Sequence, residues 1–340
     1  MIDTGFPIIN TIIGGFFISL SSSIHLLLKG KITGYSGIFF NLLTRNDFLY
    51  NFCFLLGTLI TPSYILTFNK SSFTNFENKE YFINDLNIYG FIISGLLVGF
   101  GSKMGNGCTS GHGVCGIPRL SIRSIVAVCM FMITGILTAT LKSKLNFFTY
   151  NSIKIPFIKI PYLELIIFLF CLICFIFILI KDSKSIYAKI DLNDHIISFI
   201  VGVLFAFGLI QSGMIGRHKV IGFLCLNSNW DYSLMFVLGS AVGFNLITFH
   251  YILNLRKPIF NRSFEINKNK TIDLKLMIGA GIFGIGWGMG GICPGPSLVI
   301  SFFYLPYSII FLLMVAIGQL IENSFDSMLS QSLSMKNHIE

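Results

Sequence analysis

Nine apolar runs, each long enough to cross a bilayer, dominate this 340-residue chain. A helix needs about 17–25 mostly apolar residues to span the hydrocarbon core, and a transmembrane barrel would show short alternating strands instead. Only 11% of the residues are charged, whereas soluble domains carry about 25%. The sequence therefore predicts an all-α polytopic membrane protein. The expected spans are 5–28, 47–68, 88–104, 121–141, 162–180, 194–213, 231–255, 273–289 and 299–320.

The connectors between these spans are of two kinds. Four are polar and are expected to face solvent: residues 69–86, 142–160, 181–193 and 256–272. Four are rich in glycine and partly apolar: GKITGYSGIFF (30–40), GSKMGNGCTSGHGVCG (101–116), GRHKVIGFLCL (216–226) and GIGWGMGGICPGPS (284–297). Irregular backbone is tolerated at membrane depth only when it is buried in protein or lines a wet cavity. We therefore expect four re-entrant segments inside the protein.

The glycine-rich connectors form two similar pairs. The matches are Lys31 with Lys219, Gly34 with Gly222, Gly101 with Gly286, Gly105 with Gly290, and Cys108 with Cys293. The two members of each of the first two pairs lie 188 residues apart, and those of the other three pairs lie 185 apart. These nearly equal separations indicate an internal duplication. Four spans in each half and one between them would invert the second half relative to the first. Related loops of inverted repeats meet near the bilayer midplane, where transporters bind substrate.

This duplication predicts the domain organisation and the orientation. The expected parts are a first repeat (1–150), a connecting span (151–190), a second repeat (191–325) and a C-terminal tail (326–340). In this topology one side carries 16 Lys and Arg residues and the other carries 8. The positive-inside rule then places the N-terminus outside and the C-terminus in the cytoplasm. Because the basic residues are scattered, the net charge of +9 is attributed to charged loops and not to nucleic-acid binding. The expected partners of such a membrane protein are lipids, and no nucleic acid.

Short helices are expected within two of the special connectors. Pro294 suits the first turn of a helix, so residues 293–297 are expected to start a half-helix whose positive dipole end points toward Cys293. Thr109 or Ser110 is expected to cap a second short helix after Cys108. Glycine N–H groups in such loops converge on anions. The alternative is that these glycines only break helices in a tight bundle.

Two cysteines hold equivalent places in the pairs. A neutral thiol is a weak, soft donor, so Cys108 and Cys293 would suit the polarisable sulfur of an anion better than a hard oxyanion. The alternative is that they are small buried hydrophobes, which is the interpretation for the cysteines inside apolar spans, Cys53, Cys129, Cys171 and Cys174. Cys225 would extend a thiol path, and the role of Cys115 stays open.

Other polar residues near these loops allow several interpretations. The pattern C-x3-H-x2-C formed by Cys108, His112 and Cys115 lacks a nearby fourth ligand, so we expect no metal, with His112 bonded to backbone or capping a turn. The basic residues that flank the loops would either attract an anion into vestibules or anchor at lipid headgroups. They are Lys31, Lys103, Arg119, Arg123, Arg217 and Lys219. No Asp or Glu stands in an obvious mid-span position, which weakens schemes that need an intramembrane carboxylate.

At this point the motifs resemble a known family. GCTSGHGVCGIPRLSIRS (107–124) and GIGWGMGGICPGPSL (284–298) closely resemble the YeeE/YedE sulfur-transport family, also called thiosulfate permease-like proteins. KITGYSGI (31–38) and KVIGFLCL (219–226) resemble its remaining loop motifs. The resemblance implies an hourglass-shaped, nine-span permease whose cysteines pass thiosulfate through S–H···S contacts, a role that falls on Cys108 and Cys293. The first loop differs from some members because it has no cysteine, and Cys225 stands where related sequences often carry an acidic residue.

Together these features predict a permease, not an enzyme, that imports a small inorganic sulfur anion such as thiosulfate, without a cofactor. The expected substrate-binding residues are Cys108, Cys293, Cys225, Gly105, Gly107, Thr109, Ser110, Gly111, His112, Gly290, Gly291, Pro294, Gly295, Lys31 and Lys219. Two alternatives stay open. One is a transporter or channel for another small anion or metabolite. The other is a membrane thiol protein that donates sulfur from a persulfide on Cys108, which needs an accessible thiolate.

Overall fold

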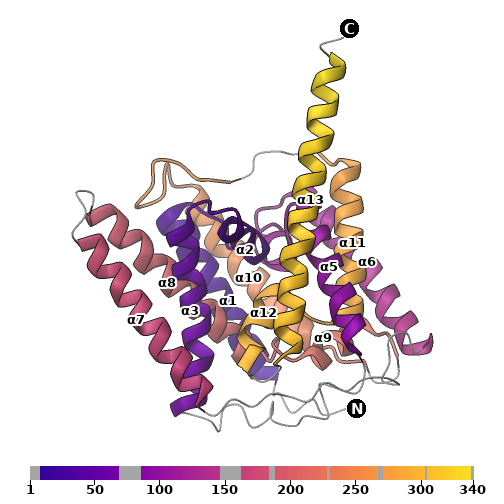
Figure 1. The fold of residues 1–340 in the computed structure, drawn as a ribbon, viewed down its shortest axis with the longest axis horizontal. Helices are drawn as coiled ribbons and strands as arrows, with labels where there is room; N and C mark the ends of the chain where they lie inside the picture. Colours follow the sequence, from indigo (N-terminus) through magenta and orange to yellow (C-terminus); the bar gives the residue numbers. More distant parts are fainter. Residues whose placement is uncertain are drawn as a thin grey trace.

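The fold is known from a computed structural model, which describes residues 8–68, 86–145, 162–183, 188–227, 230–266, 271–302 and 305–337. These residues form helices and connecting segments, without a strand (Figure 1). In chain order the helices are α1 (Ile8–Lys29), α2 (Tyr35–Leu43), α3 (Phe48–Phe68), α5 (Ile88–Met104), the π-helical segment η2 (Thr109–Val114), α6 (Ile122–Leu145), α7 (Leu163–Ser183), α8 (Ala188–Gln211), α9 (Arg217–Leu224), α10 (Ser233–Leu253), α11 (Leu274–Gly290), α12 (Pro294–Val299), the 3-10 segment η3 (Ile300–Phe302) and α13 (Tyr307–Asn337).

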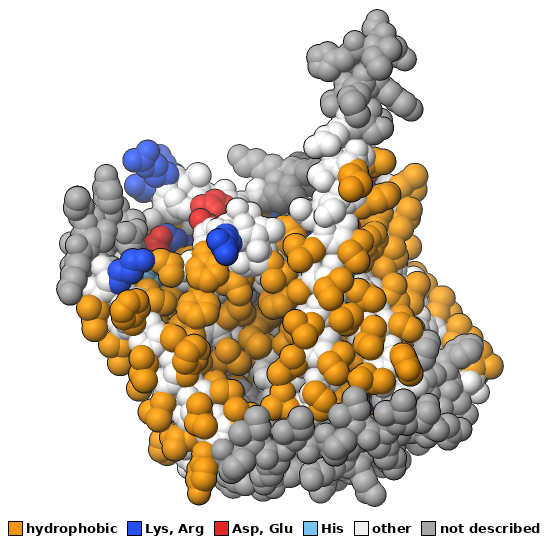
Figure 2. Space-filling view, viewed as in Figure 1, with side chains coloured by type: hydrophobic (Ala, Val, Ile, Leu, Met, Phe, Trp, Pro, Cys, Tyr) orange, Lys and Arg blue, Asp and Glu red, His pale blue; other side chains and the backbone are white. Residues whose placement is uncertain are grey.

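The long helices confirm a polytopic membrane protein. Eight spans in the described residues are long and apolar enough to cross a bilayer, and α5, with 17 residues, is a shorter apolar helix. Hydrophobic side chains cover the flank of the bundle, and charged ones gather toward the end from which α13 projects (Figure 2). The predicted span 299–320 is displaced, because α13 begins at Tyr307, directly after Pro306. A residue that precedes a proline disfavours helical geometry. The residues predicted to form a C-terminal tail, from 326 onward, continue α13 as far as Asn337.

Packing between the helices follows matching pairs. Helix α3 packs on α8 and α10 packs on α1, while α5 packs on α13 and α11 packs on α6. Helices α5 and α11 also contact each other, as do α1 and α8. Helix α7 lies at the edge of the bundle, against α3 and α8 (Figure 1). The functional centre therefore has to be sought among the paired helices and not at α7.

Glycines bring the paired helices into close contact. A Cβ atom on Gly57 of α3 would lie 2.2 Å from the Phe199 carbonyl oxygen, and one on Gly202 of α8 would lie 2.2 Å from that of Phe54. A Cβ atom on Gly279 of α11 would lie 2.3 Å from the backbone nitrogen of Gly105. Small residues at helix crossings are the usual way in which membrane helices pack, since lipid gives them no hydrophobic drive to associate.

Short helices occupy the glycine-rich connectors. Helix α2 lies toward the end of the bundle from which α13 projects, and α9 lies toward the opposite end (Figure 1). Most of two predicted polar loops, 69–86 and 142–160, falls outside the described residues. Part of a third, 256–272, folds back over the end of α1. There the backbone N–H groups of Ile259 and Phe260 donate to the carbonyls of Leu27 and Leu28. This loop therefore covers protein and does not simply face solvent.

Candidate functional site

Cys108 and Cys293 each stand directly before a short helix. Both have extended backbone, with φ −123° for Cys108 and −104° for Cys293. Helix α12 begins at Pro294, as the sequence predicts. The expectation that Thr109 or Ser110 caps the other helix is wrong, because η2 already begins at Thr109 and the Cys108 carbonyl accepts from the His112 N–H at 2.9 Å. Each thiol thus sits at a helix start.

The long helices that precede the two cysteines have the same construction. Helices α5 and α11 both contain 17 residues. The Asn87 side chain accepts from the Gly90 N–H, and the Asp273 side chain accepts from the Leu276 N–H, so both helices have the same N-terminal cap. At the other end, Gly291 ends α11 in the left-handed conformation, with φ +67°, which glycine adopts without the steric cost of a Cβ atom.

The two thiols line one small, apolar cavity. Cys108 is 2% exposed and Cys293 is 7% exposed, and the cavity has a volume of about 40 Å³. The Cys108 sulfur lies 3.2 Å from the Ser110 hydroxyl, and the Cys293 sulfur lies 3.6 Å from the Thr109 hydroxyl. Pro294 and Gly295 also line this cavity, and none of the described residues that line it is charged. A water needs about 10–15 Å³, so the space holds only a few heavy atoms.

Hydrogen bonds from three other elements hold η2 in place. The Ser110 hydroxyl accepts from the Tyr35 N–H, at the start of α2, at 3.0 Å. The Asn245 amide of α10 donates to the Val114 carbonyl at 2.8 Å. The Cys115 thiol, directly after η2, donates to the Thr33 carbonyl at 3.8 Å. The segment that begins after Cys108 is therefore fastened to α2, α10 and the approach to α2.

Asn245 is a site residue that the sequence reasoning missed. It is fully buried in α10, and its side-chain oxygen accepts from three serine hydroxyls of α1, at 2.8 Å from Ser19, 3.1 Å from Ser22 and 3.0 Å from Ser23. The sequence does contain a hint of this pairing: three consecutive serines lie within the apolar span 5–28, and a single Asn lies in the middle of the span 231–255. Polar side chains inside a membrane pair with one another, and here they pair beside the cysteine segment.

His112 fixes the turn between α5 and η2. Its Nε2 lies 3.0 Å from the Gly105 carbonyl oxygen, and its Nδ1 lies 3.1 Å from the Ser124 hydroxyl. A carbonyl can only accept, so Nε2 carries the proton and Nδ1 accepts from Ser124. Burial lowers the pKa of His112; the bond to the Gly105 carbonyl opposes this shift, and the charges of Arg123 and Arg119 add to it. Its bond to backbone is what the sequence predicted for this histidine.

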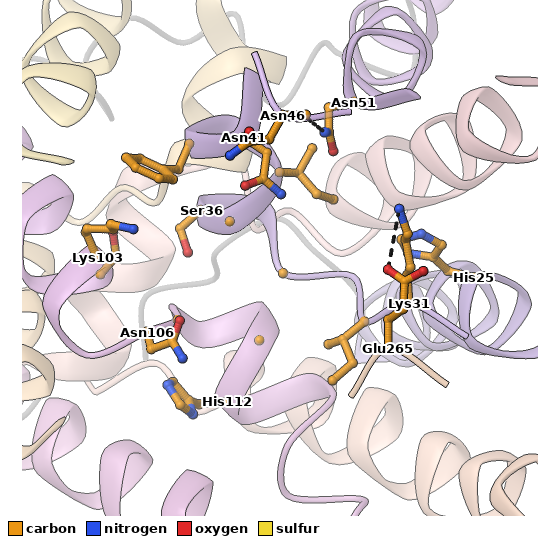
Figure 3. A pocket seen from close by; sticks show the side chains of 18 of the residues that line it. His25, Lys31, Ser36, Asn41, Asn46, Asn51, Lys103, Asn106, His112 and Glu265 are labelled. Carbon is orange, nitrogen blue, oxygen red and sulfur yellow. Dashed lines mark hydrogen bonds and ion pairs between the residues drawn. The ribbon is translucent and has the colours of Figure 1, made fainter. Parts of the chain in front are cut away.

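A much larger, polar cavity, here called the vestibule, lies beside the thiol cavity. Its volume is about 580 Å³, and Figure 3 shows its lining, with Lys103, Ser36, Asn41, Asn106 and His112 around one side. On the other side are Lys31, His25 and Glu265, which comes from the folded-back loop (Figure 3). Of the predicted site residues, those that line the vestibule are Lys31, Gly107, Gly111 and His112.

Two glycines separate the vestibule from the thiol cavity. Gly34 and Gly111 line the vestibule, while their neighbours Tyr35 and Ser110 line the thiol cavity. A Cβ atom on Gly34 would lie 3.7 Å from the Gly111 Cα atom. The backbones at the start of α2 and in η2 therefore approach each other at the boundary between the two spaces.

The remaining predicted residues line neither cavity. Cys225 ends α9, and the Asn227 amide donates to its sulfur at 3.4 Å. Lys219 is fully buried and donates to the Ser212 carbonyl at 2.8 Å. The carbonyl of Gly105 accepts from His112 and that of Gly290 accepts from Arg217, while Gly291 ends α11. Among the described residues, no three His, Cys, Asp or Glu side chains form a group that could hold a metal ion.

Comparison with known proteins identifies the chain. Residues 31–138 match the family model described as "Sulphur transport", and residues 194–332 match a family of unknown function (DUF6691). A "Probable transporter" of Xylella fastidiosa (strain Temecula1 / ATCC 700964) is 35% identical over 139 residues, which are 92% of that protein and 41% of this chain. The chain belongs to the sulphur transport family. A second probable transporter of the same strain is 43% identical over 129 residues, which are 90% of that protein and 38% of this chain.

This membership, together with the candidate spans, makes the chain a multi-pass membrane transporter of the sulphur transport family. A transporter does not need a catalytic centre, in agreement with the expectation that the chain is not an enzyme. Each of the two relatives corresponds to less than half of this chain. The sulphur transport match covers α2, α3, α5, η2 and part of α6, and thus includes Cys108, His112 and the whole η2 segment.

Proposed function

We propose that the protein imports a small sulfur-containing anion of the thiosulfate type through the thiol cavity. One observation carries the proposal. Two cysteines that stand 185 residues apart in the chain come from two short-helix starts and line one cavity of about 40 Å³. The anion passes from one side of the membrane to the other through this cavity and the vestibule, and the close approach of Gly34 and Gly111 forms the narrow point between them.

The contrast in size supports a small substrate. The vestibule is large enough to hold a hydrated anion together with its water, whereas the thiol cavity admits only a few heavy atoms. An anion that enters the smaller space therefore leaves most of its water behind. Hydrogen bonds from the protein have to replace that water, because burying an unpaired charge is costly.

The donors around the thiol cavity suit an anion with a terminal sulfur. The thiols of Cys108 and Cys293 are soft donors, and the hydroxyls of Thr109 and Ser110 stand beside them. The described lining of this cavity is uncharged, which keeps binding weak enough for release. We place the sulfur of the anion between the two thiols and its oxygens toward the hydroxyls and the N–H groups at the helix starts.

We further propose that the two halves are inverted repeats around an hourglass-shaped route, with re-entrant segments at η2 and α12. The matching caps of α5 and α11 support this, as do the paired packing of α3 on α8 with α10 on α1 and the opposite placement of α2 and α9 (Figure 1). The proposed first repeat is 1–150 and the second is 191–325, with the span in 151–190 between them. On the positive-inside rule the C-terminus is cytoplasmic, so the vestibule is the exit side.

The test is uptake of sulfur-labelled thiosulfate into proteoliposomes. Cys108→Ala and Cys293→Ala are each expected to lower uptake by about tenfold or more, the effect of losing one hydrogen bond to a charged group. Cys171→Ala is the matched control, because Cys171 is a fully buried thiol of α7 that lines neither cavity; it is expected to transport like the native chain.

Three outcomes separate the parts of the proposal. Native uptake that disappears in both cavity variants, with normal folding, supports the thiol route. Equal uptake by all four proteins contradicts a role for the thiols. No thiosulfate uptake by the native chain would show that the substrate is another small anion, and sulfite and sulfate would then be measured in the same assay.

A further inference from the structure

The vestibule contains more positive charge than its own acidic residues neutralise. Lys31 is paired with Asp47 at 2.8 Å and with Glu265 at 3.6 Å. Arg123 lies 3.7 Å from Asp273 and donates to the Thr271 carbonyl at 2.7 Å. Two lining cations, Lys103 and Arg119, have no acidic partner within hydrogen-bond distance in the described part of the chain. The vestibule therefore attracts anions.

Lys103 is held in a defined position at the end of α5. Its ammonium group lies 3.7 Å from the centre of the Phe40 ring, a cation–π contact that orients the side chain without neutralising its charge. The acidic groups that act on it from α13 are Glu322 and Asp326, and both are bound by Lys275, at 3.2 Å and 2.5 Å. The charge of Lys103 is thus available to a ligand in the vestibule.

Three further donor groups lie on the same side of the vestibule as this ammonium (Figure 3). They are the hydroxyl of Ser36 and the side-chain amides of Asn41 and Asn106. The described residues include no hydrogen-bond partner for any of these three side-chain groups. One cation and three neutral donors with free N–H or O–H groups on one side of a cavity form a polar arrangement that is incomplete without an acceptor.

We propose that Lys103, Ser36, Asn41 and Asn106 form an oxyanion subsite in the vestibule, separate from the thiol cavity. This inference rests on the proposed function and deepens it. The ammonium, hydroxyl and amide N–H groups of the subsite can hold the oxygens of an anion in charge-assisted hydrogen bonds, and the subsite contains no thiol. It therefore binds sulfate and thiosulfate alike, and selection for sulfur takes place only at Cys108 and Cys293.

The experiment measures equilibrium binding of sulfur-labelled sulfate and thiosulfate to the purified full-length protein, at low and high NaCl. We expect the native protein to bind both anions with similar affinity. Lys103→Gln should weaken both by about tenfold, the effect of one lost charge-assisted hydrogen bond, and Lys103→Arg should restore most of the affinity. Lys257→Gln is the matched control, since Lys257 is an exposed lysine outside the vestibule lining and its loss changes the net charge equally.

The double variant Cys108→Ala, Cys293→Ala distinguishes this subsite from the proposed function. It should keep sulfate binding at the native level while it loses thiosulfate uptake. Sulfate binding that is absent from the native protein, unchanged by Lys103→Gln, or lost in the double cysteine variant would overturn the subsite. If thiosulfate uptake fails but sulfate binding still depends on Lys103, the subsite stands and the proposed substrate does not.

Discussion

The two cysteine segments occupy equivalent places but are held by different forces. The Asn245 amide of α10 donates to the Val114 carbonyl of η2, and the Ser110 hydroxyl of η2 accepts from the Tyr35 N–H. No side chain of α1, α2 or α10 hydrogen-bonds to α12 within the described residues. Instead, Ser297 bonds to the Pro294 carbonyl of its own helix, at 2.8 Å, and a Cβ atom on Gly295 would lie 3.1 Å from the Tyr35 ring.

This difference shows that one geometry can be built in two ways. In a membrane interior, buried hydrogen bonds are costly to break because no water replaces them, so η2 depends on its polar partners. Proline reduces the conformational freedom of the unfolded chain, so α12 is stabilised by its own sequence and by close packing. Mutations that remove polar groups should therefore disturb the Cys108 side, and the Cys293 side should tolerate them.

Asn245→Leu is expected to have the largest effect. It removes the donor to the Val114 carbonyl and the acceptor of three serine hydroxyls. Leaving buried polar groups unpaired costs about 1–3 kcal/mol, so thermal stability in detergent and thiosulfate uptake should both fall clearly. Ser240→Ala is the control on the same helix, since that hydroxyl donates only to the Phe236 and Val237 carbonyls of α10. Equal melting temperatures for the two variants would mean that Asn245 does not hold η2.

The second prediction concerns acid. The pKa of His112 is lowered by burial, so below its ordinary value of 6.5 the unfolded chain binds a proton that the folded chain does not. Stability therefore rises with pH in this range, and the melting temperature should fall as the pH is lowered from 7 to 5. His112→Gln, whose amide donates to the Gly105 carbonyl without titrating, should make this fall smaller.

His250→Gln is the matched control for this effect, because His250 is an exposed histidine of α10. It should leave the pH dependence of the melting temperature at its native slope. A His112→Gln variant with the native slope would show that other groups cause the acid sensitivity. The α12 segment contains no histidine, so the same titration cannot act from within the Cys293 side.

The sequence predicts what depends on local patterns. Run length and composition place the long helices, and the proline in CPGP predicts where α12 begins. The matches between connectors predict less well. Lys31 lies before α2, whereas Lys219 lies inside α9, and Gly34 caps α2 whereas Gly222 is interior to α9. Similarity to the Lys31 motif therefore wrongly predicted that Lys219 lies at the site, since Lys219 lines neither cavity.

Features that depend on contacts distant in the chain could not be read from the pattern. The bond from Asn245 to the Val114 carbonyl joins residues 131 apart, and Glu265 reaches Lys31 because the loop after α10 folds back onto the end of α1. The buried carboxyl of Glu322 was not predicted either, because the expected span ended at residue 320, whereas α13 continues to Asn337. The sizes of the two cavities follow from how the helices pack, which no local pattern encodes.

The smallest expected effect is that of Pro294→Ala. Helix α12 begins at this residue, where a proline costs no hydrogen bond because the first N–H of a helix is unpaired. Its removal acts chiefly through the freedom of the unfolded chain, which corresponds to about 0.4–1 kcal/mol, and uptake should stay in the native range. The measurements are the melting temperature and thiosulfate uptake, beside Cys293→Ala. A Pro294→Ala variant as inactive as Cys293→Ala would show that the proline ring contacts the anion, and that α12 is more than a pre-shaped support for its thiol.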